Sequence, residues 1–104
     1  MKPETDLQQR VVKFYRDLGC EVYVKSQPRR TMQTPGIPDL KVFCERKGCA
    51  WHHETKTPEG KQSKVQMKYQ RLAEVCGETY ILGGMKVARV QLKMIGVLVG
   101  GGGA

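Results

Sequence analysis

The sequence predicts an α/β domain in which a mixed β-sheet is flanked by helices, with the element order α-β-β-β-α-β-α. Three kinds of observation lead to this fold class. Apolar residues recur at helical spacing near the start of the chain and again in its second half. Short segments rich in β-branched and aromatic residues lie between and after these helices, and a tight turn separates two of them. The length of 104 residues makes one compact domain the simplest expectation.

A first helix is expected over residues 5–18. Its apolar side chains share one helical face and are Leu7, Val11, Phe14 and Leu18. Thr5, with Gln8 three residues later, matches a capping box at the start of this helix. Gly19 supplies a natural end, because glycine readily adopts the left-handed backbone that closes many helices.

Three strands are expected next, over residues 20–24, 40–44 and 50–55. Each is short and contains the residue types that favour extended backbone. A polar loop over residues 25–38 separates the first strand from the second. A turn over residues 45–48 joins the second strand to the third, so these two are expected to pair as a hairpin.

A second amphipathic helix is expected after the third strand. Ser63 and Gln66 match another capping box and mark its start, and Gly77 is expected to end it. A fourth strand is expected over residues 79–82, and a weaker third helix over residues 85–95. The sheet is therefore expected to have helices packed against it.

The chain is strongly basic, with 18 Lys and Arg against 10 Asp and Glu and a net charge of +8. This excess favours a polyanionic partner such as DNA. No apolar run approaches the roughly 20 residues that span a bilayer, and the polar, acidic start does not resemble a secretory signal. We therefore expect a cytoplasmic protein without a membrane partner. One domain over residues 1–99 and a flexible glycine-rich tail over residues 100–104 are expected.

The four cysteines are widely and irregularly spaced, which favours buried small apolar side chains over disulfides. Cys44 and Cys49, with His52 and His53 close behind, leave a zinc site as an alternative. The absence of a Cys-x-x-Cys pair counts against it.

Two acidic residues and a lysine carry the chemistry that the sequence suggests. Asp39 lies in the segment GIPDL at residues 36–40, and the paired strand leads into Glu54, Thr55 and Lys56. Mg²⁺ takes oxygen ligands, usually from one or two protein carboxylates. Asp39 and Glu54 are therefore candidate metal ligands, with the backbone carbonyl of Thr55 as a third. Lys56 shares a strand face with Glu54, where its ammonium group can stabilise negative charge on a phosphate. An ordinary surface ion pair is the simpler alternative for an isolated Glu-x-Lys.

These features together resemble the VRR-NUC family of the PD-(D/E)XK nuclease superfamily, over about residues 4–83. Three sequence blocks carry the resemblance, in the order that the family has them: GIPDLKVF at residues 36–43, WHHETK at residues 51–56 and TPEGKQSKVQ at residues 57–66. The resemblance implies a restriction-endonuclease-like fold, a mixed central sheet flanked by helices.

The resemblance also implies a role for each matching residue. Asp39 and Glu54 would be metal ligands, and Lys56 would be a catalytic residue. Gln66 would be the active-site glutamine of the second helix, although the capping box with Ser63 also explains it.

One position departs from the pattern. Many nucleases of this superfamily carry a metal-binding glutamate on the first helix, and Gln8 stands at the matching place here. Gln8 could bind the metal or serve only as a helix cap, and Glu4 or Asp6 nearby could replace it. Two metal ions are therefore less strongly implied than one.

The resemblance implies a metal-dependent DNA endonuclease that uses Mg²⁺, with Mn²⁺ able to substitute. Stand-alone members of the family resemble phage enzymes that resolve branched DNA, such as Holliday junctions, as homodimers. The apolar residues 94–99 are a candidate dimer interface, and core packing explains them equally well. A nuclease of flap or single-strand specificity and a non-catalytic DNA-binding module are the alternatives.

Several basic and polar residues are candidates for contact with DNA. Arg29 and Arg30 lie in the loop before Asp39. They are candidates because binding residues concentrate on such loops. The start of the second helix is suited to phosphate, and its candidates are Lys61, Ser63, Lys64 and Lys68.

Overall fold

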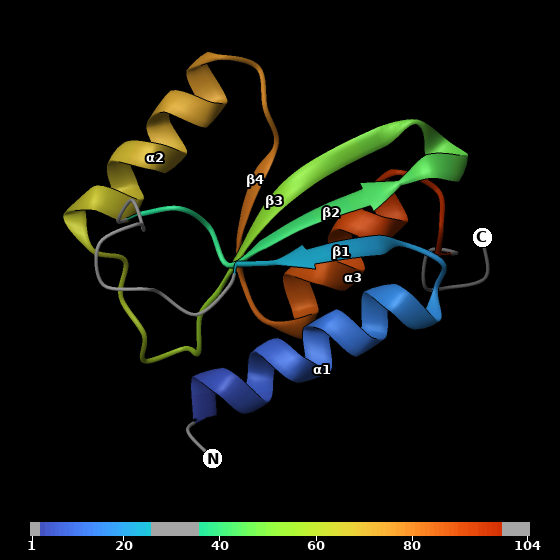
Figure 1. The fold of residues 1–104 in the computed structure, drawn as a ribbon, viewed down its shortest axis with the longest axis horizontal. Helices are drawn as coiled ribbons and strands as arrows, with labels where there is room; N and C mark the ends of the chain where they lie inside the picture. The colour runs from blue at the N-terminus through green and yellow to red at the C-terminus, as the bar shows by residue number, and fades with distance from the viewer. Residues whose placement is uncertain (1–2, 26–35, 99–104) are drawn as a thin grey trace.

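The computed structural model describes residues 3–25 and 36–98, in which three α-helices surround a four-stranded sheet (Figure 1). The elements in chain order are α1 Pro3–Asp17, β1 Glu21–Val24, β2 Leu40–Cys44, a short 3-10 helix η1 Glu45–Lys47, β3 Cys49–Thr55, α2 Lys64–Val75, β4 Tyr80–Gly83 and α3 Met85–Met94. The predicted element order is confirmed. Arg29, Arg30, Val99 and the tail 100–104 lie outside the described residues.

The sheet is mixed, with its strands in the order β1-β2-β3-β4. β1 and β2 are antiparallel, as are β2 and β3, whereas β3 and β4 are parallel. Parallel neighbours need a crossover connection, and α2 supplies it. The predicted hairpin forms through η1, and Gly48 closes that turn with a left-handed φ of +64°.

α1 begins at Pro3, two residues before the predicted start. Proline is well suited to the first turn of a helix, because a backbone N–H at that position has no partner within the helix and proline lacks one. The predicted capping box of Thr5 and Gln8 is wrong, because Thr5 lies inside the helix. At the other end Gly19 follows the helix with a φ of +88°, as predicted.

α1 and α3 cover one face of the sheet, and the hydrophobic core lies between them and the strands (Figure 1). Fully buried side chains at its centre are Val11, Tyr15, Leu40, Val42, Trp51 and Leu92. Ile95, Val97 and Leu98 pack against this core, whereas Met94 is exposed. Core packing therefore accounts for most of the described part of the candidate interface segment.

α2 lies apart from the other helices and beside β4 (Figure 1), and its side chains contact the face of the sheet opposite to α1. Ala73 is its one buried residue, so polar contacts account for much of its attachment. The β1–β2 part of this face is open, with Tyr23 and Phe43 exposed. None of the helices within the described ranges is long and apolar enough to cross a membrane.

Candidate functional site

The sequence-predicted acids meet where β2 begins and β3 ends. The register pairs Leu40 with His53, so Asp39 comes directly opposite Glu54. Both side chains lie on the face that α2 covers, since Gln66 of α2 contacts Glu54 there. The hairpin therefore brings together two carboxylates that are far apart in sequence.

Asp39 is held by the end of β3. Its Oδ2 accepts hydrogen bonds from the backbone N–H of Thr55 at 3.0 Å and from the Thr55 hydroxyl at 2.6 Å. A carboxylate that receives two donors from one residue has little freedom to turn. Thr55 thus fixes the orientation of Asp39.

Glu54 is buried, with 2% of its surface exposed. Its Oε2 accepts a hydrogen bond from Gln66 Nε2 at 3.1 Å, but its Oε1 has no hydrogen-bond partner among the described residues. Buried polar atoms in folded proteins almost always have partners. Glu54 therefore presents an oxygen that the rest of the fold does not satisfy.

Electrostatics at Glu54 reflect this setting. Burial, and after it the negative charge of the neighbouring Asp39, raise the pKa of Glu54 from 4.5 to about 7. The charges of Lys56 and Lys25 act in the opposite direction and lower this pKa. Two carboxylates therefore share the site with two nearby ammonium groups. Lys56 was identified from the sequence, whereas Lys25 was not.

Gln66 forms the predicted helix cap and also contacts Glu54. The side-chain Oε1 of Gln66 accepts from the backbone N–H of Ser63 at 2.8 Å, and the backbone N–H of Gln66 donates to the Ser63 hydroxyl at 3.2 Å. The predicted capping box is confirmed. Because Oε1 is used in the box, Nε2 is free to donate to Glu54. The cap therefore orients the amide toward the carboxylate.

Lys56 directly follows β3. Its backbone N–H donates to the carbonyl oxygen of Gly83 at 3.2 Å, which anchors it to the end of β4. Its half-buried side chain lines a hollow of about 470 Å³ together with Leu7 of α1 and Gly84. The first turns of α1 therefore approach Lys56.

A buried polar network supports β3 on the opposite face of the sheet, where α1 packs. His53 is fully buried, and its Nε2 contacts the Gly83 carbonyl oxygen at 2.9 Å while its Nδ1 contacts the Tyr15 hydroxyl at 2.7 Å. A carbonyl oxygen can only accept, so Nε2 carries the proton and Nδ1 accepts from Tyr15. Trp51 Nε1 donates to the Tyr15 oxygen at 3.2 Å. Burial lowers the pKa of His53, which keeps this arrangement uncharged.

The chain enters the site through a close contact with α2. Gly36 has a φ of +91°, and a Cβ at this position would lie 2.7 Å from the backbone oxygen of Val65. Only glycine fits both the backbone angle and the space. The glycine of the GIPD segment therefore lets the loop pass beside the start of α2.

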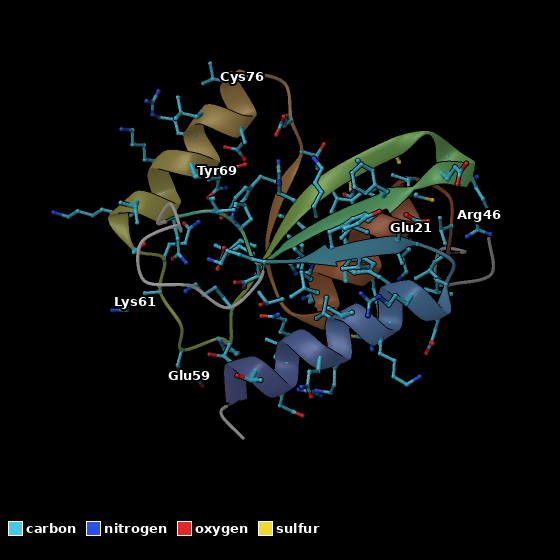
Figure 2. The ribbon with its side chains drawn as sticks, in the orientation of Figure 1. Glu21, Arg46, Glu59, Lys61, Tyr69 and Cys76 are labelled. Carbon is cyan, nitrogen blue, oxygen red and sulfur yellow. The ribbon has the colours of Figure 1, made fainter. Side chains whose placement is uncertain are left out.

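Further contacts that the sequence did not reveal join α2 and β4 to this face. His52 Nε2 lies 2.6 Å from a Glu78 carboxylate oxygen, and its ring packs edge-on against Tyr69, which projects from α2 (Figure 2). Gln62 bridges the Tyr80 hydroxyl at 3.4 Å and Gln70 at 2.9 Å. These side chains attach α2 to the sheet.

The other predicted site residues lie around this centre or beyond the described part. Gln8 is half-buried on α1, and no hydrogen bond within the described ranges joins it to Asp39 or Glu54. Glu4 lies in the first turn of α1, and its side chain is not described. The basic candidates before and on α2 are exposed, and Lys61 points outward from its loop (Figure 2); they are Lys61, Lys64 and Lys68.

The zinc alternative finds no support among the cysteines. Cys44 and Cys49 face each other across the hairpin as free thiols, and His53 is engaged in the core network. Across residues 3–25 and 36–98, no three His, Cys, Asp or Glu side chains gather in a way that could hold a metal ion. The Asp39–Glu54 pair has two acids, the number that Mg²⁺ commonly takes from a protein.

The fold and the site define an α/β domain with a carboxylate pair at the strand ends, flanked by lysine and glutamine. A solved structure described as a VRR_NUC domain shares this architecture, with a TM-score of 0.72 and 22% sequence identity, over 90% of this chain and 97% of that chain. The sequence matches no family model and no curated protein. At this identity the likeness establishes the fold, and the predicted restriction-endonuclease-like architecture is confirmed.

Proposed function

We propose that this chain is a divalent-metal-dependent DNA nuclease of the VRR-NUC family. The observation that carries the proposal is the carboxylate pair, in which Glu54 is buried with one oxygen lacking a described partner. A buried polar atom without a partner costs free energy, so a role in folding alone does not explain Glu54. A bound cation would satisfy that oxygen and offset the repulsion between Glu54 and Asp39.

The donors at this site fit Mg²⁺, with Mn²⁺ able to substitute. Asp39 and Glu54 would supply carboxylate oxygens. The Thr55 carbonyl would be a third ligand, because the N–H and C=O of one strand residue point the same way and the Thr55 N–H faces Asp39. All three are hard oxygen donors of the kind that Mg²⁺ prefers. When bound, the ion supplies positive charge to a phosphate and makes water more acidic.

The residues of the chain would then divide the remaining work. Gln66 holds Glu54 by one oxygen and leaves the other free, and Thr55 holds Asp39. The Lys56 ammonium group would stabilise negative charge as water attacks phosphorus. The bond from phosphorus to the 3′ oxygen then breaks, which leaves a 5′ phosphate on the product.

DNA is the substrate that the charge of the chain favours. The net charge is +8, and the exposed lysines before and on α2 could contact phosphates. The family resemblance extends this to endonucleolytic cleavage of branched DNA, such as Holliday junctions, by a homodimer. Two symmetric sites suit a four-way junction. Flap and single-strand substrates are the competing specificities.

The test compares labelled four-way junction, flap and linear duplex DNA, each with Mg²⁺, with Mn²⁺ and with a chelator. We expect cleavage only with a divalent metal, and a fall in rate of about 100-fold or more in Lys56→Ala, with an unchanged circular dichroism spectrum. Binding without cleavage, or cleavage that survives both Asp39→Ala and Glu54→Ala, would instead identify a non-catalytic DNA-binding module.

A second comparison isolates the contact between Gln66 and Glu54. Gln66→Ala removes that contact, so we expect the cleavage rate to fall about tenfold or more. Gln70→Ala is the matched control, since Gln70 lies one turn later on α2 and bonds to Gln62 and Glu74 instead. Equal rates for the two variants would remove Gln66 from the proposed mechanism.

A further inference from the structure

Lys25 extends the site by one strand. The last paired residues at this end of the sheet are Val24 of β1, Leu40 of β2 and His53 of β3. One residue further along, the same register places Lys25, Asp39 and Glu54 opposite one another. The backbone N–H of Lys25 donates to the Asp39 carbonyl oxygen at 2.8 Å, which continues the pairing by that residue. Directly opposite residues on neighbouring strands have side chains about 5 Å apart on one face. Lys25, Asp39 and Glu54 therefore form a row across three strands.

The side chain of Lys25 is fixed beside this row. It is half-buried, and its ammonium group donates to the carbonyl oxygen of Ile37 at 3.0 Å. An ammonium group has three N–H donors, so this bond orients the group and leaves donors for a ligand.

The two lysines follow different strands on either side of the carboxylate pair. Lys56 follows β3, and Lys25 follows β1 at the far side of Asp39. A phosphodiester has two non-bridging oxygens, so a phosphate held at the pair could meet one cation at each. The sequence alone gave no reason to single out Lys25, because the row exists only once three strands are in register.

We propose that Lys25 is a second substrate-contacting cation, which binds a non-bridging phosphate oxygen of the DNA strand held at the Asp39–Glu54 site. This inference rests on the proposed nuclease function. The competing role is structural, in which Lys25 only holds Ile37 and the entry to Asp39. The two roles differ in what they predict for salt dependence, since each phosphate contact by a lysine releases counterions.

The test measures DNA binding and cleavage separately. Binding of labelled duplex DNA is followed by fluorescence anisotropy over a series of salt concentrations, with Ca²⁺ in a Lys56→Met background, and electrophoresis checks that the DNA stays intact. Lys25→Met removes the charge and keeps most of the stem, and Lys25→Arg keeps the charge. Lys93→Met, an exposed residue in the last turn of α3, removes one charge elsewhere.

We expect Lys25→Met to reduce the slope of log affinity against log salt by about one. Lys25→Arg and Lys93→Met should keep the original slope. With Lys56 intact, Lys25→Met should lower kcat/KM for cleavage about tenfold, and Lys93→Met should not. An unchanged slope in Lys25→Met overturns the inference, whatever happens to cleavage. If the wild-type protein cleaves no DNA, the proposed function fails first, and the slope still reports on Lys25.

Discussion

At the scale of single residues, Glu54 differs from the buried apolar side chains around it. Burial of Leu40 and Trp51 stabilises the folded protein, whereas burial of a carboxylate costs free energy because the group loses its hydration. Gln66 compensates one oxygen of Glu54 and leaves the other without a described partner. Such a group is stabilised either by holding a proton or by binding a cation, and the two states compete.

This competition predicts how stability depends on pH. Burial and Asp39 raise the pKa of Glu54 from 4.5 to about 7, so the folded protein keeps a proton that the unfolded chain releases between these values. The resulting stabilisation is fully present below pH 4.5 and is lost as pH rises through 7. In a chelator, we expect the free energy of unfolding to fall by up to about 3 kcal/mol from this group, measured by urea denaturation.

Glu54→Gln is the control for this titration. Glutamine keeps the shape and cannot ionise, so the variant should lose less stability over the same pH range. At about pH 8, Mg²⁺ should stabilise the wild-type protein more than the variant, because a ligand that binds only the folded state stabilises it. Identical curves for the two proteins would contradict this account of Glu54.

At the scale of elements, the site depends on how closely the loop before β2 passes α2. Gly36 lies against the Val65 backbone with a left-handed φ. Gly77, which ends α2, also has a positive φ of +83°, but no atom lies within 4 Å of the place where its Cβ would be. The two glycines therefore separate the cost of backbone strain from the cost of a clash.

We expect Gly36→Ala to destabilise the protein by about 2 kcal/mol or more, because strain and a backbone clash act together. Gly77→Ala should cost about 1 kcal/mol, from strain alone. Urea denaturation of both variants measures the difference. Gly36→Ala should also slow cleavage, since the clash moves the segment that leads to Asp39. Equal losses of stability in Gly36→Ala and Gly77→Ala would show that the contact with Val65 is dispensable.

At the scale of the whole molecule, the Tyr15 network connects the helical layer to the end of the sheet that carries the carboxylate pair. Tyr15 belongs to α1, Trp51 and His53 to β3, and Gly83 to β4. Gly83 in turn accepts from the backbone of Lys56. A hydroxyl on the first helix therefore helps to fix the strand ends that carry the site.

Tyr15→Phe should destabilise the protein by about 2 kcal/mol or more, because it leaves two buried groups, on His53 and Trp51, without a partner. Tyr80→Phe is a matched control, since the Tyr80 hydroxyl has one long contact of 3.4 Å with Gln62, and its loss should be smaller. Urea denaturation compares the two. The network would lose its importance if both variants were equally stable.

Local patterns in the sequence were enough to predict the element order, the hairpin, the α2 capping box and the acids that pair across β2 and β3. Periodicity, turn glycines and capping residues act over a few positions, so a single chain reveals them. The predicted start of α1 was wrong because the Thr5–Gln8 pattern was interpreted as a cap, whereas the helix begins at Pro3, a residue suited to the first turn.

Beyond this hairpin, tertiary structure alone decided which distant side chains meet. The row of Lys25, Asp39 and Glu54 requires three strands in register, and the bond from Tyr15 to His53 requires α1 to pack on the sheet. The double role of Gln66 needs the helix cap and the strand end to come together. Contacts of this kind depend on register and packing between segments that lie far apart along the chain, which no short stretch of sequence specifies.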